Sequence, residues 1–465
     1  MFASMIALMV GAVAASSQRS SLPATYGDFT IDRLPTVRST GGRLVERPRE
    51  QKVTSNVLSL RQAKSASLSS SYIQAMRQEG MNAASRAARA EGGNAALLAV
   101  EGGNVFLAQA QFGGEDFFVV VDTGSSDPWL ATSGFQCYDV YDGSEQEEAY
   151  CEFGPVYDPA LSTTYSPLAD QNFNISYADG EYLTGSLGFE TVTMAGITVA
   201  NQQFATVNRA AWFGDGFSSG LVGLAYRTLT SAYAGTTGKG RRILYDPLFV
   251  NMYTNAGIPS VFSFALDRNN DIGGVLALGG IPDVKRSPYF ASTPILPVGV
   301  NSTDGALVYQ YYTIDIDGYA FSSDASTQFN PINTNNPRKK PLVGNGTDVI
   351  VDSGTTLCYV SSAVAEAVAA AFNPPAQYDE STSVYFVDCT AKAPIFGVSI
   401  SKKIFWVNSL DLIINLGGET CVMGIQPNLG GLSILGDVFM KNVVSVFDIG
   451  AEEMRFSARQ FTSIF

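Results

Sequence analysis

Short apolar runs separated by turn residues extend through most of the chain and predict a protein built mainly from β-strands. Residues 117–121 (FFVVV) form a continuous apolar run, which is typical of a buried strand. Residues 174–177 and 182–185, joined by the turn Ala178-Asp179-Gly180, predict a β-hairpin. Three patches favour helix instead: residues 55–66, 71–89 and 363–372. The pattern therefore indicates an all-β fold with few helices.

One strand-and-turn pattern occurs twice. Residues 119–121 lead into Asp122-Thr123-Gly124-Ser125-Ser126, and residues 349–351 lead into Asp352-Ser353-Gly354-Thr355-Thr356. Each copy is followed by a later glycine-containing apolar segment, 220–226 in the first half and 433–439 in the second. The repeat predicts two related lobes, each of which supplies one Asp; the alternative is a pair of ordinary β-turns.

Two carboxylates in contact cannot both ionise easily, so they tend to share one proton. Such a pair is half acid and half base, which suits it to activating a water molecule and protonating a leaving group. The chain contains no His, which excludes Ser-His-Asp and Cys-His catalysis and histidine metal sites. Its five Cys residues form no C-x-x-C motif, so we expect no metal and no cofactor.

The N-terminal region divides into two predicted segments. Residues 1–17 contain an apolar run followed by Ala12-Val13-Ala14 and predict a secretory signal peptide; the run is too short for a membrane anchor. Residues 18–100 carry 12 basic and 6 acidic residues, although the whole chain has a net charge of −14. A basic leader before an acidic body predicts a docked propeptide, and the alternative is a disordered basic tail.

We expect the mature protein to begin between Ala95 and Asn104. An N-terminal lobe over 101–285 and a C-terminal lobe over 286–465 then follow, and they meet near the turn residues 279–288. The acidic body argues against nucleic-acid or anionic-membrane partners.

These motifs resemble those of the pepsin-like aspartic proteases, especially the secreted fungal enzymes. The resemblance extends from about Val105 to the end of the chain and rests on several segments in the family's order. They are residues 122–126 with Trp129, 157–159 with 162–165, 177–180, 220–226, 352–356 and 434–437. The resemblance implies an all-β, bilobal pepsin-like fold with a central peptide cleft, in which Asp122 and Asp352 are the catalytic pair.

The resemblance also implies roles for the residues around the pair. Thr123 and Ser353 would tie the two turns together by crossed hydrogen bonds. Ser125 and Thr355 would hydrogen-bond the outer carboxylate oxygens, and Gly124 and Gly354 would allow the tight turns. The alternative is that these residues only cap turns.

The hairpin resembles the substrate-covering flap of the family. Tyr177 matches the flap tyrosine, Trp129 matches the tryptophan that hydrogen-bonds it, and Gly180 lies in the flap turn. Asp179 resembles the acidic flap residue of fungal enzymes that accept Lys near the cleaved bond, because a carboxylate pairs with an ammonium group. The alternative is an Asp selected for the hairpin turn.

The remaining assignments concern covalent features. The resemblance implies the disulfides Cys137–Cys151 and Cys389–Cys421 and leaves Cys358 as a buried free thiol. Three N-x-[ST] sequons predict glycosylation of Asn174, Asn301 and Asn345.

The function that the resemblance implies is a secreted aspartic endopeptidase, made as a zymogen and active at acidic pH, with hydrophobic residues flanking the scissile bond. Its partners would be protein and peptide substrates, its own propeptide and pepstatin-type inhibitors, and we expect a monomer that is extracellular or vacuolar. Two alternatives remain. A catalytically inert binding or inhibitor protein on the same fold would typically lose an active-site Asp, and a glycosidase would not require two related Asp turns.

Overall fold

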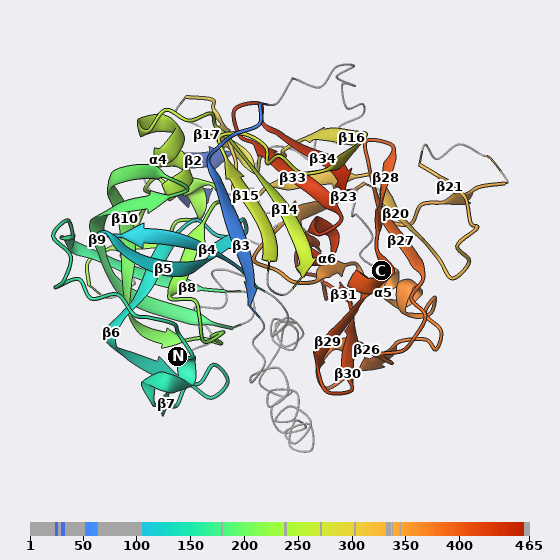
Figure 1. The fold of residues 1–465 in the computed structure, drawn as a ribbon, viewed down its shortest axis with the longest axis horizontal. Helices are drawn as coiled ribbons and strands as arrows, with labels where there is room; N and C mark the ends of the chain where they lie inside the picture. Colours follow the sequence, from blue (N-terminus) through green and yellow to red (C-terminus); the bar gives the residue numbers. More distant parts are fainter. Residues whose placement is uncertain are drawn as a thin grey trace.

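The computed structural model describes residues 24–26, 29–32, 52–63, 105–177, 180–236, 240–269, 272–301, 304–331, 336, 338–344 and 346–459. Strands dominate this part of the chain, so the predicted all-β class is confirmed. Figure 1 shows the N-terminal half, in cyan and green, beside the C-terminal half, in orange and red, with β14 (Val261–Asn269) and β15 (Ile272–Leu278) between them. The signal peptide predicted for residues 1–17 lies outside the described residues.

The largest sheet runs from the N-terminal half into the region between the halves. Its order is β13-β12-β8-β9-β10-β6-β11-β5-β4-β3-β15-β14-β33-β34-β16, with β7 paired to β6. In chain order the remaining bounds are β3 Val57–Ala63, β4 Val105–Phe112, β5 Glu115–Asp122, β6 Pro128–Tyr138, β7 Glu145–Gln146, β8 Ser166–Ser176, β9 Tyr182–Met194, β10 Ile197–Ala211, β11 Gly220–Gly223, β12 Ala232–Ala234, β13 Arg242–Ile243, β16 Arg286–Pro294, β33 Val443–Asp448 and β34 Glu453–Arg459.

Smaller sheets build the C-terminal half, in the orders β19-β23-β32-β24-β31, β20-β27-β28, β25-β26-β30-β29 and β21-β22. Their bounds are β19 Thr313–Ile316, β20 Gly318–Ser322, β21 Phe329–Asn330, β22 Lys340–Pro341, β23 Thr347–Val351, β24 Cys358–Val360, β25 Gln377–Asp379, β26 Val384–Val387, β27 Ile395–Ile400, β28 Lys403–Val407, β29 Ile413–Gly417, β30 Thr420–Met423, β31 Ile425–Pro427 and β32 Ile434–Leu435. A further sheet joins β1 (Ala24–Tyr26) and β2 (Phe29–Asp32) to β17 (Gly299–Asn301) and β18 (Leu307–Val308).

The described helices are short. They are α4 Leu248–Asn255, α5 Ser362–Ala369, α6 Asp437–Met440, and the 3₁₀ turns η3 Glu148–Cys151, η4 Arg227–Leu229 and η5 Ser409–Leu412. The helix predicted over 363–372 is confirmed as α5, which ends earlier. None of the described helices combines the length and apolar character that a membrane span requires.

The apolar run 117–121 lies within β5, as predicted. β5 pairs antiparallel with β4 and parallel with β11, so it has a neighbour on each edge. Val119 and Val121 are fully buried and Val120 is nearly so, which explains why this strand lacks alternating polar residues. A core cluster that includes Val121, Phe262, Val351 and Phe447 packs the two halves together.

The helix predicted over residues 55–66 is wrong, because residues 57–63 form strand β3. This strand pairs antiparallel with both β15 and β4, and therefore fills the slot between them. Leu60 is 2 % exposed, whereas its neighbours Ser59 and Arg61 are exposed, which is the two-residue period of a strand. The backbone partners offered by β15 and β4 override local helix propensity. The second helix predicted in the leader, over 71–89, lies outside the described residues.

Candidate active site

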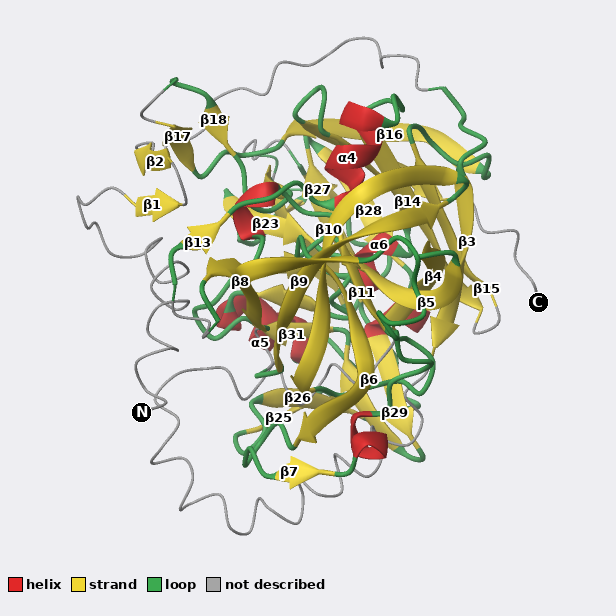
Figure 2. Cartoon of the chain, turned by 90° about the vertical axis from the view of Figure 1, so that its left-hand side faces the viewer, coloured by secondary structure: helices red, strands yellow, loops and turns green. Residues whose placement is uncertain are grey.

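The two Asp turns lie at equivalent places in the two halves. Asp122 ends β5 beside Gly223 of the parallel strand β11. Asp352 directly follows β23, whose last residue Val351 lies beside Leu435 of the parallel strand β32. The predicted hairpin is also present, as β8 paired with β9 (Figure 2). The duplication seen in the sequence is therefore a duplication of strand arrangement.

Crossed hydrogen bonds join the two turns. The Thr123 hydroxyl donates to the carbonyl of Val351 at 3.0 Å and accepts from the amide of Ser353 at 2.9 Å. In the mirror arrangement, the Ser353 hydroxyl donates to the carbonyl of Val121 at 2.8 Å and accepts from the amide of Thr123 at 3.2 Å. All four bonds are buried, so each turn fixes the position of the other.

Each carboxylate accepts two local bonds. Asp122 accepts the amide of Gly124 at 2.7 Å on Oδ1 and a short bond from the Ser125 hydroxyl on Oδ2. Asp352 accepts the amide of Gly354 at 2.9 Å on Oδ1 and the Thr355 hydroxyl at 2.7 Å on Oδ2. The residues Asp122 and Asp352 are 6 % and 7 % exposed. The acceptor positions are thus satisfied symmetrically, and the remaining faces point toward the opposite turn.

The two carboxylates influence each other electrostatically. Burial raises the pKa of Asp122 well above its usual range, and the nearby charge of Asp352 raises it further, while the bonds from Ser125 and Gly124 act in the opposite direction. The pair therefore retains a proton at a pH where an exposed Asp has lost its own. A pair that holds one proton contains both a base and an acid.

Glycine is required in both turns because the opposite carboxylate lies against each of them. A Cβ on Gly124 would lie 2.6 Å from Oδ2 of Asp352, and a Cβ on Gly354 would lie against Oδ1 of Asp122. A side chain at either glycine would therefore push the carboxylates apart.

The hairpin β8–β9 places Tyr177 beside two tryptophans. Trp129 donates its Nε1 hydrogen to the Tyr177 hydroxyl at 2.9 Å. Trp212 packs edge to face on the Tyr177 ring, with 5.8 Å between the ring centroids. Burial and then the charge of Asp122 raise the pKa of Tyr177, so its hydroxyl stays protonated. Gly180, in the turn of the hairpin, has a φ of +97°, which favours glycine. Asp179 lies outside the described residues, and its proposed pairing with Lys stays a prediction.

Several residues of this region were missed by sequence reasoning. Trp212, Glu181 and the pair Asp127–Tyr245 all lie near Tyr177 or Trp129, although only Trp129 and Tyr177 were identified from the sequence. Trp212 packs on Trp129 at 5.1 Å, and it follows the strand β10 without any motif of its own. The available signal was its rarity, since the chain has only three Trp residues.

Asp127 is a fully buried carboxylate directly before the strand that carries Trp129. Its Oδ1 accepts the amide of Ser231 at 2.8 Å and the hydroxyl of Tyr245 at 2.5 Å. Its Oδ2 is buried and has no hydrogen-bond partner within the part of the chain that the structure describes. Burial raises the pKa of Asp127 to about 6, even though the bonds from Tyr245 and Ser231 and the charge of Arg242 lower it.

This carboxyl group makes the fold more stable in acid. Because the pKa of Asp127 is raised in the folded state, the folded protein keeps a proton that the unfolded chain loses near pH 4. The contribution of this group to the free energy of unfolding is therefore fully present below about pH 4 and is lost as the pH rises through 6. The loss amounts to about 3 kcal/mol above pH 6. We expect Asp127→Asn to be more stable than the parent at pH 7.5 and equally stable at pH 3.5.

Urea unfolding in an Asp122→Asn background, which prevents self-cleavage, measures this difference. The exposed Asp283→Asn is the control for charge removal and should leave the pH dependence unchanged. Equal pH dependence of Asp127→Asn and its parent would contradict the assignment.

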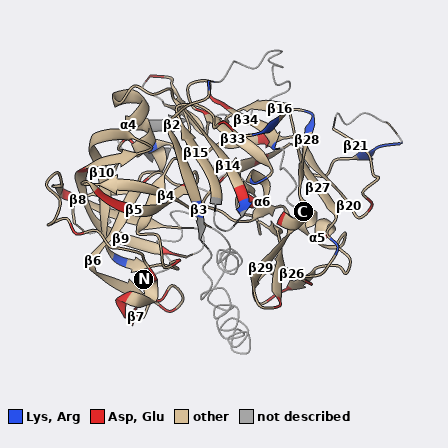
Figure 3. Cartoon of the chain, viewed as in Figure 1, with Lys and Arg blue, Asp and Glu red and all other residues tan. Residues whose placement is uncertain are grey.

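Both predicted disulfides are confirmed. Cys137–Cys151 and Cys389–Cys421 have S–S lengths of 2.06 Å, and the first closes the loop that contains β7 and several acidic residues (Figure 3). Cys358 is a buried free thiol, and burial raises its pKa to about 12, so it is not a nucleophile. Asn174 lies in β8 and Asn301 ends β17, both half-buried, whereas Asn345 lies outside the described residues; glycosylation of all three stays a prediction.

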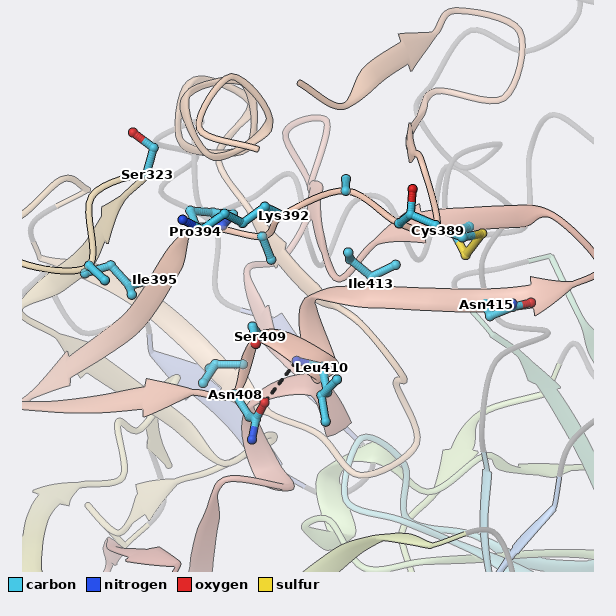
Figure 4. Close-up of a pocket in the computed structure, with 16 residues that line it drawn as sticks. Ser323, Cys389, Lys392, Pro394, Ile395, Asn408, Ser409, Leu410, Ile413 and Asn415 are labelled. Carbon is cyan, nitrogen blue, oxygen red and sulfur yellow. Dashed lines mark hydrogen bonds between the residues drawn. A yellow bond between two sulfur atoms is a disulfide. The ribbon is translucent and has the colours of Figure 1, made fainter. Parts of the chain in front are cut away.

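A separate pocket of about 690 Å³ lies in the C-terminal half beside the disulfide Cys389–Cys421 (Figure 4). Lys392, Leu410 and Ile413 are among its lining residues, and neither Asp turn contributes to it. This pocket has no part in the site built by Asp122 and Asp352. Within the described residues, no three Cys, Asp or Glu side chains gather in a way that would hold a metal ion.

Two buried carboxylates carried on paired strand turns, one from each half of an all-β fold, define the pepsin-like class of aspartic peptidases. The chain belongs to the eukaryotic aspartyl protease family, whose model matches residues 108–459. It is an aspartic-type endopeptidase.

Relatives of the chain carry names of the same kind. It is 41 % identical over 377 residues to a "probable aspartic-type endopeptidase" of Aspergillus fumigatus, which covers 79 % of this chain and 81 % of that protein. It is 30 % identical over 330 residues to rhizopuspepsin-4 of Rhizopus niveus, with 70 % of each chain covered. It is 27 % identical over 346 residues to secreted aspartic protease 8 of Candida albicans, with 74 % and 73 % covered.

Proposed function

We propose that this aspartic endopeptidase is made as a secreted zymogen and hydrolyses protein substrates at acidic pH. The observation that carries the proposal is the buried pair Asp122 and Asp352, with its crossed hydrogen bonds and the raised pKa of Asp122. Paired carboxylates need acid to keep their shared proton, so the activity belongs to acidic solution.

In the proposed reaction the pair holds a water molecule. The ionised carboxylate takes a proton from the water as its oxygen attacks the scissile carbonyl carbon, and the protonated carboxyl donates a hydrogen bond to the developing oxyanion. The tetrahedral intermediate then collapses, the C–N bond breaks, and the leaving nitrogen receives a proton from the pair. Thr123 and Ser353 hold the two turns in register, and Ser125 and Thr355 orient the outer oxygens.

The proposed substrate is a peptide segment with hydrophobic residues beside the cleaved bond. Tyr177 would cover it as the flap and exclude water. An aromatic group lies beside the dyad, the pair Asp122 and Asp352, and consists of Tyr177, Trp129 and Trp212. This group supports a preference for apolar side chains. Pepstatin-type peptides would bind in the same place, and the enzyme would act as a monomer.

The proposed propeptide, residues 18–100, acts as an intramolecular inhibitor until acid releases it. Strand β3 supports this, because a leader segment occupies a slot between β4 and β15 and buries Leu60 in the core shared by the two halves. Thr54 adds a side-chain bond to the carbonyl of Leu278 at 3.0 Å. Acid protonates carboxylates of the body near pH ~4 and weakens their attraction for the basic leader.

The proposed location is extracellular or vacuolar. The signal-like residues 1–17 and the two disulfides support passage through an oxidising compartment. A relative named as a secreted aspartic protease supports the same location.

Acid activation tests the proposal. The purified secreted precursor, shifted to pH 3.5, should digest denatured haemoglobin, be blocked by pepstatin, and acquire a new N-terminus between Ala95 and Asn104. Digestion without a new N-terminus would reject the zymogen part. A folded, processed protein without digestion would favour an inert binding protein on the same fold.

A further inference from the structure

Glu181, the residue after the flap turn, is buried although its side chain is ionisable. It is 5 % exposed, and its Oε1 accepts the backbone amide of Phe213 at 2.7 Å. Glu181 directly precedes β9, whereas Phe213 follows β10, so the bond joins the foot of the flap to a segment outside the hairpin. A carboxylate is a strong acceptor for a buried N–H group.

The segment that donates this bond is itself held by backbone contacts to residues 152–154. The amide of Gly216 donates to the carbonyl of Glu152 at 2.8 Å, and the amide of Gly154 donates to the carbonyl of Ser218 at 2.8 Å. A Cβ on Gly214 would collide with the carbonyl oxygen of Glu152, so the two backbones are in contact. Residue 151 is held by its disulfide to Cys137, so residues 212–218, called the platform below, contact a cross-linked segment.

Tyr177 rests on the same platform and is linked to Glu181. Its ring packs on Trp212, the residue next to Phe213, at 5.8 Å. Its backbone amide donates to the carbonyl of Glu181 at 2.8 Å, across the base of the flap turn. Glu181 therefore fixes one end of the turn to the platform while Tyr177 contacts the platform from the other end.

We propose that Glu181 is a positioning residue, which holds the flap in the conformation that places Tyr177 over the dyad. A side chain that cannot accept this hydrogen bond would remove the link between the hairpin and the half-buried amide of Phe213, and would so loosen the base of the flap. A smaller share of molecules would then be ready to bind, and substrate would have to order the flap. The inference rests on the proposed function of the dyad and flap.

The kinetic test compares Glu181→Ala with Glu181→Gln. For Glu181→Ala we expect the KM for a peptide substrate and the inhibition constant of pepstatin to rise together, about tenfold, with kcat within about threefold of wild type, because the flap is ordered once substrate is bound. Gln retains an acceptor oxygen of the same reach and should restore both values. Unchanged KM and pepstatin binding in Glu181→Ala, with only a lower Tm, would reduce Glu181 to a structural residue and overturn the proposal, as would a fall in kcat alone.

A second measurement does not depend on activity. Amide hydrogen exchange of residues 176–186 and of Phe213 should be faster in Glu181→Ala than in Glu181→Gln or wild type, with exchange in β33 and β34 unchanged. If wild type cleaves no peptide, the proposed function fails. This measurement still decides whether the bond between Glu181 and Phe213, the tether, holds the hairpin in place. Equal exchange at the flap in all three proteins would overturn the tether whatever the activity.

Discussion

Asp122→Asn should abolish peptide hydrolysis while leaving the fold intact. The amide cannot take a proton from water, and loss of a positioned general base lowers rates by about 10²–10⁴-fold. Here the change also removes the charge that keeps the pair half-protonated, so we expect the upper end of this range or more. Asn keeps an acceptor oxygen for the amide of Gly124, and its NH₂ group can donate to the Ser125 hydroxyl in place of the bond that Oδ2 accepts.

The matched control is Asp116→Asn, which makes the same chemical change in the same strand, β5, at an exposed position. Turnover of a fluorogenic peptide at pH 3.5, with Tm measured in parallel, separates the two effects. The Tm of Asp122→Asn should equal or exceed that of wild type, because neutralising one of two buried carboxylates removes their repulsion. Residual activity within tenfold of wild type would remove Asp122 from the reaction.

The dyad could be predicted from the sequence because each Asp lies in a short local pattern, and the pattern occurs twice. An apolar strand, an Asp, a hydroxyl residue and a Gly occupy consecutive positions at 119–124 and again at 349–354. The crossed bonds connect residues 230 positions apart, and the sequence indicated them only through the resemblance. Once the two turns lie side by side, the bonds follow from the hydroxyl groups of Thr123 and Ser353, each of which donates one bond and accepts one.

The missed residues depend on contacts between distant segments that carry no motif. Tyr245 reaches Asp127 across 118 positions, and Glu181 reaches Phe213 across 32. Neither Tyr245 nor Glu181 differs locally from an ordinary polar residue in a β protein. Strand β3 was mistaken for a helix for a related reason: its conformation is imposed by β4 and β15, which lie elsewhere in the chain.

Gly354→Ala should damage both activity and stability, because the added methyl group occupies the space of the opposite carboxylate. The nearest atoms to such a Cβ are Oδ1 and Cγ of Asp122, the latter at 2.7 Å, and neither belongs to a flexible chain end. Hydrogen bonds from Gly124 and Ser125 hold Asp122, so the clash with the added Cβ is relieved only if the two turns separate. A displacement of about 1 Å at reacting groups costs about 10²-fold in rate, and overpacking costs about 1–3 kcal/mol of stability.

Gly431→Ala is the matched control for this substitution. Gly431 is exposed, and like Gly354 it does not adopt a left-handed φ; its added Cβ would meet only the carbonyl of Asn428, at 3.1 Å. The control should retain wild-type turnover, with stability close to that of wild type, because the gain from restricting the unfolded chain is set against this one close contact. Gly124→Ala, whose Cβ would lie 2.6 Å from Oδ2 of Asp352, should reproduce the loss from the other side of the axis. Since the two glycines face opposite carboxylates, a loss in only one of them would show that the turns do not contribute equally to the dyad.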